Sequence, residues 1–107
     1  MLFRSLREFV EEWLGPLQRQ EAQGRASAPL VATVEALAGA SWSPRAAARR
    51  LNVHVNTLLY RLQRVRELTG RDLDDPDVRL ALTLALRART LLGGPSAEPA
   101  RDRAAAG

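Results

Sequence analysis

The chain has 107 residues, a net charge of +4 and 46% apolar residues, which predicts one small folded domain. It contains no cysteine and a single histidine, so disulfides and thiol chemistry are excluded and neither a metal site nor a cofactor is expected. It has no apolar run of about 18 residues and no signal-peptide pattern, so we expect a cytoplasmic protein without membrane contact.

The first predicted element is a helix over residues 2–14. Leu2, Leu6, Phe9 and Trp13 recur there at helical spacing. The dipeptide Gly15-Pro16 predicts the end of this helix. The polar stretch that follows is rich in small residues, and we expect residues 1–17 to be joined to the rest by a linker over residues 18–28.

Three further helices are predicted between residues 29 and 68. Residues 29–38 begin with Pro29, which suits a first helical position. Residues 43–51 begin with Ser43 as N-cap and Pro44 as the first helical residue. After a short turn, residues 55–68 form a helix that Gly70 closes as a left-handed cap.

A fifth helix is predicted from Asp75 to about Leu92. Asp75 is a good N-cap and Pro76 follows it, while two glycines at 93 and 94 end the helix. Residues 78–88 also alternate as a strand would, but their alanine and leucine content favours a helix. We therefore predict a small all-α domain over residues 29–92, and a disordered tail over residues 93–107.

The positive charge is concentrated in one segment of the chain. Every basic residue is arginine, and residues 41–71 hold seven arginines against one acidic residue, Glu67, a net charge of +6. The remainder of the chain is slightly acidic. Such a block favours a polyanionic partner, although a solvated charged face is the alternative.

The helix over residues 55–68 carries two different faces. With about 100° between successive residues, Leu58, Leu62 and Val65 share one side. Asn56, Tyr60 and Gln63 share the opposite side, with Thr57 and Arg64 on its flank. Amide side chains can bond an adenine edge, and tyrosine can stack or bond a phosphate. The alternative is that Tyr60 packs under a neighbouring element and that the two amides are incidental.

The two helices at 43–51 and 55–68 have the spacing of a helix-turn-helix. Small Ala48 permits a close crossing, and Leu51, Val53, Leu58 and Leu62 fill the angle between the helices. In such a unit the second helix enters the major groove with its N-terminal half. Some units of this shape bind protein instead, so a helical protein-interaction module remains the rival hypothesis.

These considerations assign roles to particular side chains. The base-facing candidates are Asn56, Tyr60, Gln63 and Arg64. The phosphate-contacting candidates are Arg45, Arg49, Arg50, His54, Thr57 and Arg61. His54 has a structural alternative, which is to cap the second helix or close the turn. No acid is placed to orient His54 for hydrolysis, so we expect no enzyme.

The sequence resembles a known family over roughly residues 30–92. The motif is His54, Asn56-Thr57-Leu58 and Tyr60-Arg61-Leu62, then residues 70–76 and a leucine-rich helix. This is similar to the C-terminal DNA-binding domain of PucR-type transcription regulators, the purine-catabolism and sugar-diacid regulator group.

The resemblance implies a helix-turn-helix like that of the factor for inversion stimulation, acting in sequence-specific binding of double-stranded DNA. Residues 1–17 also resemble the end of the preceding domain in this family, with a dimerisation element as the alternative. The resemblance further implies that any effector binds outside this chain. The family usually has arginine where this chain has Val55, so one contact that the family would make is absent here.

The fifth helix predicts a homodimer. Leu80, Leu84 and Leu91 lie opposite Leu82 and Ala85 on its helical wheel, and one helix-turn-helix core can cover only one of these sides. The first helix folding back is one candidate cover, and a second copy of the chain is the other. Two copies would also bring two recognition helices to two half-sites.

Overall fold

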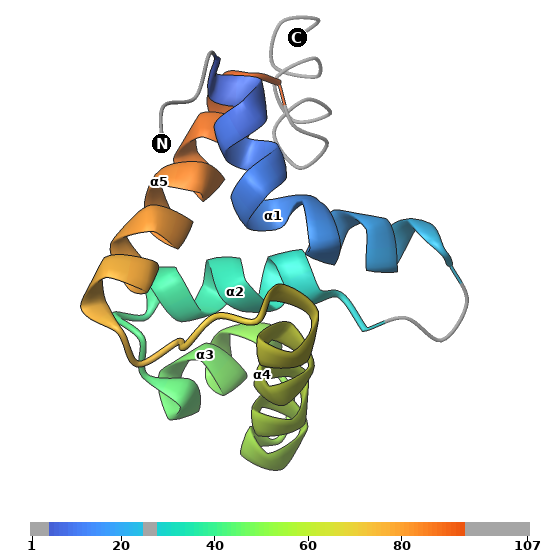
Figure 1. Cartoon of the computed structure of the whole chain (residues 1–107). Coiled ribbons are helices and arrows are strands. Elements are labelled where there is room, and N and C mark those ends of the chain that lie inside the picture. Colours follow the sequence, from blue (N-terminus) through green and yellow to red (C-terminus); the bar gives the residue numbers. More distant parts are fainter. Residues whose placement is uncertain (1–4, 25–27, 94–107) are drawn as a thin grey trace, which may run out of the picture.

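The computed structural model describes residues 5–24 and 28–93. Within these ranges the chain is all-α, as predicted, and no residue is in a strand (Figure 1). The helices are α1 (Leu6–Ala22), α2 (Leu30–Gly39), α3 (Pro44–Leu51), α4 (Val55–Thr69) and α5 (Pro76–Leu91). The predicted disordered tail lies outside the described residues, apart from Gly93. None of the helices in the described ranges has the length and hydrophobicity of a membrane-spanning segment.

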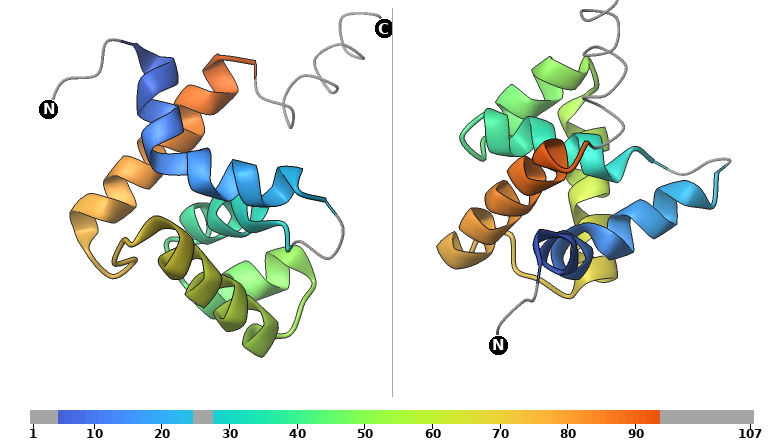
Figure 2. Two further views of the ribbon diagram at one scale, coloured as in Figure 1. Left: turned by 45° about the vertical axis from the view of Figure 1, so that its right-hand side comes forward. Right: turned by 90° about the horizontal axis from the view of Figure 1, so that it is seen from above.

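Helix α2 is the centre of the fold. It contacts each of the other four helices, and it lies between the α1–α5 pair and the α3–α4 pair (Figures 1 and 2). Its buried side chains are Leu30, Val31, Thr33, Val34, Ala36 and Leu37. The hydroxyl of buried Thr33 donates to the Pro29 carbonyl at 2.8 Å, so its polar group is satisfied inside the core.

Local capping signals set most helix ends where the sequence predicts them. The Ser43 hydroxyl accepts from the Ala46 N–H at 3.2 Å, and the Asp75 carboxylate accepts from the Asp77 N–H at 2.8 Å. Gly70 ends α4 with a φ of 68°, the left-handed conformation that glycine adopts without strain. Asn52 ends α3 in the same conformation, with a φ of 57°.

The predicted end of the first helix is wrong. Helix α1 continues through Gly15 and Pro16 to Ala22, although Pro16 lacks the N–H for one helical hydrogen bond. Leu14 and Leu17, on either side of this dipeptide, are completely buried, and their packing outweighs the local cost of proline. The helix bends about halfway along its length (Figure 1).

Residues 18–22, predicted to be part of a linker, are therefore helical, and one of them, Glu21, contacts the beginning of α2. The Glu21 carboxylate accepts from the Val31 N–H at 2.7 Å and so caps the beginning of α2. Pro29 is the N-cap of α2 rather than its first helical residue. The division of the chain into domains stays a prediction.

An arginine of the basic block fastens α1 to the loop between α4 and α5. The Arg71 guanidinium is 2.9 Å from the Glu12 carboxylate and lies 3.7 Å from the centroid of the Trp13 ring. Such an ion pair and cation–π contact tie together residues that are distant in sequence. Arg71 thus stabilises the packing of α1, although its place in the arginine-rich segment 41–71 suggested only a contribution to the positive charge.

Helix α5 is covered on one side only. Leu82, Ala85, Leu86 and Ala88 are buried, and α1 packs along this helix (Figure 2). Leu80, Leu84 and Leu91 remain 59%, 49% and 79% exposed. The first helix does fold back onto α5, as one of the two candidate covers, but it leaves these three leucines in contact with solvent.

We predict that Leu14→Ala lowers the free energy of unfolding by about 2–5 kcal/mol, because it leaves a cavity where α1 meets the core. Leu6→Ala is the matched control on the same helix, since Leu6 is 50% exposed, and it should change stability by about 0.5 kcal/mol or less. Urea unfolding followed by circular dichroism measures both. Equal, small effects of the two variants would show that α1 is not part of the core.

Candidate nucleic-acid interface

The crossing of α3 and α4 is built from small and branched apolar side chains. Ala47 and Ala48 of α3 are buried, as are Leu58 and Leu62 of α4. The connecting turn is fixed by a hydrogen bond from the Val53 N–H to the Ala48 carbonyl at 3.0 Å. This close packing sets the direction of α4 relative to the rest of the domain.

The side of α4 opposite this crossing is open to solvent. Asn56, Tyr60 and Gln63 are all exposed, and Tyr60 exposes 65% of its surface. Leu58, Leu62 and Val65 on the other side are buried. The two faces that the helical wheel predicts are therefore present, and Tyr60 does not pack under a neighbouring element.

His54 is the N-cap of α4. Its Nδ1 accepts from the Asn56 N–H at 3.0 Å, so the structural alternative weighed for this residue is present. An accepting Nδ1 requires the proton of the neutral ring to be on Nε2. The exposed His54 ring thus keeps one donor, Nε2–H, which has the chemistry to bond a phosphate.

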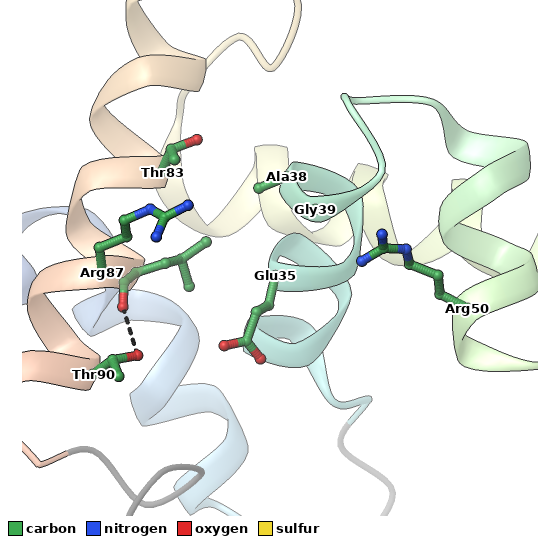
Figure 3. Close-up of a pocket in the computed structure, with 8 residues that line it drawn as sticks. Glu35, Ala38, Gly39, Arg50, Thr83, Arg87 and Thr90 are labelled. Atoms are coloured by element: carbon green, nitrogen blue, oxygen red, sulfur yellow. Dashed lines mark hydrogen bonds between the residues drawn. The ribbon is translucent and has the colours of Figure 1, made fainter.

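The predicted phosphate-contacting arginines do not all point the same way. Arg45 and Arg49 of α3 are exposed. Arg50 extends from α3 toward the C-terminal end of α2 (Figure 3), where its Nη1 lies 2.5 Å from the place that a Cβ on Gly39 would take. There it lines a pocket of about 330 Å³ together with Glu35 and Arg87. The structure therefore separates Arg50 from the outward face of α4.

Two predicted base-facing residues share an acidic neighbour on α4. The Arg64 Nη1 lies 2.8 Å from one carboxylate oxygen of Glu67, and the Gln63 amide nitrogen lies 3.5 Å from the other. The hydrogen bond from Arg64, and second the one from Gln63, hold the pKa of the Glu67 carboxyl below its ordinary value. Glu67 thus compensates the charge of Arg64 in the free protein.

The sequence analysis did not identify the pairing of Glu67 with Arg64 and Gln63, or Leu59 as part of the outward face of α4. The pairing could have been predicted, because residues three and four apart on a helix are neighbours. Leu59 is 46% exposed beside Asn56 and Gln63, and its position about 100° from Leu58 was the signal. Thr57 is exposed and Arg61 half-buried on the same helix.

Among the described residues, no group of three or more histidine and acidic side chains could hold a metal ion.

Comparison with known proteins identifies this unit. Residues 30–88, more than half of the chain, match the family model of the PucR C-terminal helix-turn-helix domain. The chain is 49% identical over 45 residues to the purine catabolism regulatory protein of Bacillus subtilis (strain 168). It is 52% identical over 44 residues to the carbohydrate diacid regulator of Escherichia coli (strain K12).

The matched stretches are a small part of these relatives. They cover 42% and 41% of this chain but only 8% and 11% of the two regulators. No solved structure matches the chain significantly. The matched family is a domain of transcription regulators rather than a class of enzymes.

We predict that Arg64→Ala raises the pKa of the Glu67 carboxyl toward its ordinary value, because it removes the strongest hydrogen bond to the carboxylate. A carboxyl with a depressed pKa stabilises the fold above the ordinary pKa, and loses this contribution as the pH falls through the depressed value. A ¹³C NMR titration of the Glu67 carboxyl measures the shift. Arg66→Ala is the control, because Arg66 is on the same helix but makes no hydrogen bond to Glu67 among those that shift its pKa. The same titration curve in all three proteins would contradict the pairing.

Proposed function

Since the chain belongs to the PucR C-terminal helix-turn-helix family, we propose that it binds double-stranded DNA sequence-specifically as the DNA-binding part of a transcription regulator. The observation that carries this proposal is the exposed amide–phenol–amide face of α4, within a segment of net charge +6. A cytoplasmic location follows from the proposed contact with DNA.

The proposed contacts to phosphates come from α3 and from the N-terminal half of α4. Arg45 and Arg49 are exposed on α3, where the helix-turn-helix places the DNA backbone. Thr57 flanks the outward face of α4, and half-buried Arg61 lies one turn further along, closer to the core side. His54 offers Nε2–H at the N-terminus of α4. Each neutralised phosphate releases counterions, so these contacts supply affinity for any sequence. Arg50 is also exposed and is a further candidate, although its side chain lies over Gly39 in the free protein.

The proposed contacts to bases come from the face of α4 itself. The amides of Asn56 and Gln63 can each donate to and accept from one adenine edge, and Tyr60 can meet a thymine methyl group or bond a phosphate. Asn56 and Tyr60 lie in the N-terminal half of α4, the half that a recognition helix presents to the groove. Arg64 can reach a guanine or a phosphate once it separates from Glu67.

The second candidate function is binding of a partner protein through the same face. Exposed Leu59 and Tyr60 favour this alternative, because apolar and aromatic side chains are common at protein interfaces. The charge of the surrounding segment favours DNA. The two functions differ in their salt dependence, since only duplex binding should weaken steeply as the salt concentration rises.

We also propose that the DNA-binding unit is a homodimer formed through α5. Leu80, Leu84 and Leu91 are exposed along one side of this helix after α1 has covered the other. A second copy presents the same leucines, so a two-fold axis would bury both sets against each other. We further propose that any effector binds outside this chain.

We predict that Asn56→Ala or Tyr60→Ala weakens binding to a selected duplex by roughly 1–3 kcal/mol and leaves binding to random duplexes nearly unchanged. Arg49→Ala, the comparison variant, should weaken binding to both and reduce the slope of log K against log salt by about 1. Fluorescence anisotropy at several salt concentrations measures both effects. Equal losses on selected and random duplexes for Asn56→Ala and Tyr60→Ala would contradict the assignment of base contacts.

We predict that Leu84→Glu converts the protein from a dimer to a monomer, because it places a carboxylate in the proposed apolar interface. Leu6→Glu is the matched control, since Leu6 is a similarly exposed leucine on α1. Sedimentation equilibrium at tens of micromolar protein, with and without DNA, measures the mass. A wild-type chain that is monomeric under both conditions would rule out the dimer.

A further inference from the structure

One apolar side chain on the outward face of α4 has no partner in the core. Leu59 is 46% exposed, whereas Leu58 is completely buried and Leu62 is 3% exposed. Leu59 belongs neither to the buried core nor to the partly buried residues that pack against it. Its side chain therefore contributes little to the stability of the described fold.

The position of Leu59 places it among the proposed base-reading groups. It is about 60° around the helix from Asn56 and about 40° from Gln63. It is also three residues from the first and four from the second, the spacings at which helical side chains are neighbours. Asn56, Leu59 and Gln63 thus form one continuous surface of amide, hydrocarbon and amide.

A single exposed leucine is ordinary on a protein surface. The kind of partner that Leu59 could contact is therefore inferred from the side chains around it. Its neighbours on the helix are polar groups able to bond base edges, and the segment carries seven arginines. Large apolar patches are the usual mark of a protein interface, and on the described part of α4 only Leu59 and Tyr60 are large exposed hydrophobic residues. These two side chains are compatible with a protein partner but do not form such a patch. DNA is the partner that this mixture of groups fits best.

The major groove offers one apolar group, the C5-methyl of thymine, beside hydrogen-bonding groups on all four bases. A leucine can gain only from the methyl, because it has nothing to donate or accept. Resting on the proposed DNA binding, we propose that Leu59 is a specificity-determining residue that contacts a thymine methyl. This thymine is in, or next to, the A·T pair whose adenine is read by Asn56 or Gln63.

The test removes the C5-methyl group from the thymine and the isopropyl group from Leu59. A duplex selected from a random pool is prepared with each thymine replaced in turn by deoxyuracil, which lacks only the C5-methyl. Binding of the wild-type chain should fall by roughly 3–5-fold at one position, the effect of losing about one buried methyl. Leu59→Ala should bind the thymine duplex correspondingly weakly and should not distinguish thymine from deoxyuracil at that position.

Leu6→Ala is the control, because Leu6 is an exposed leucine on α1, far from Leu59 in the sequence. This variant should keep the full response to deoxyuracil. The inference is overturned if Leu59→Ala responds to every deoxyuracil as the wild type does, and DNA binding itself would then still stand. It is also overturned if Leu59→Ala weakens binding to selected and random duplexes equally, since that result would show that Leu59 supports the conformation of α4. A wild-type chain that selects no duplex at all would instead overturn the proposed function.

Discussion

The burial of α2 is the constraint on which the rest of the structure depends. This short helix contacts all four others, and its apolar side chains occupy nearly its whole circumference, so it is stable only when it is enclosed. Helices α1 and α5 cover it from one direction and α3 and α4 from another. The loss of any one of these covers would expose a part of α2 to water.

This enclosure determines which surface α4 has left for chemistry. Leu58, Leu62 and Val65 are fully used in packing, so the opposite side of α4 can carry polar residues at no cost to the core. An amide, a phenol and a second amide lie there, and Glu67 further along the helix pairs with Arg64. The arrangement combines a rigid support with solvent-exposed side chains, which is the usual requirement for specific recognition.

The parts of the fold that the sequence predicts correctly are those controlled by nearby residues. Ser43, Gly70 and Asp75 act within a few residues of themselves, so the bounds of α3, α4 and α5 follow closely from them. The Gly15-Pro16 signal is equally local, but the burial of Leu14 and Leu17 by distant segments overrides it. Tertiary contacts of that kind are not visible in a local pattern.

The candidate site divides in the same way. The exposure of Asn56, Tyr60 and Gln63 follows from helical geometry alone. The direction of Arg50 does not, because its guanidinium lies where a residue with a Cβ at position 39, in another helix, would clash with it. The internal use of Arg71 depends similarly on Glu12 and Trp13, far away in sequence. Long side chains are placed by their three-dimensional neighbours, which charge counting cannot reveal.

The central claim is that the outward face of α4 meets DNA. Its most direct test is a ¹⁵N NMR titration of the labelled chain with a duplex selected from a random pool. If this face binds DNA, the largest chemical-shift changes and line broadening fall on residues 54–64, including the side-chain amides of Asn56 and Gln63. Changes concentrated on the exposed side of α5, with α4 unaffected, would contradict this claim.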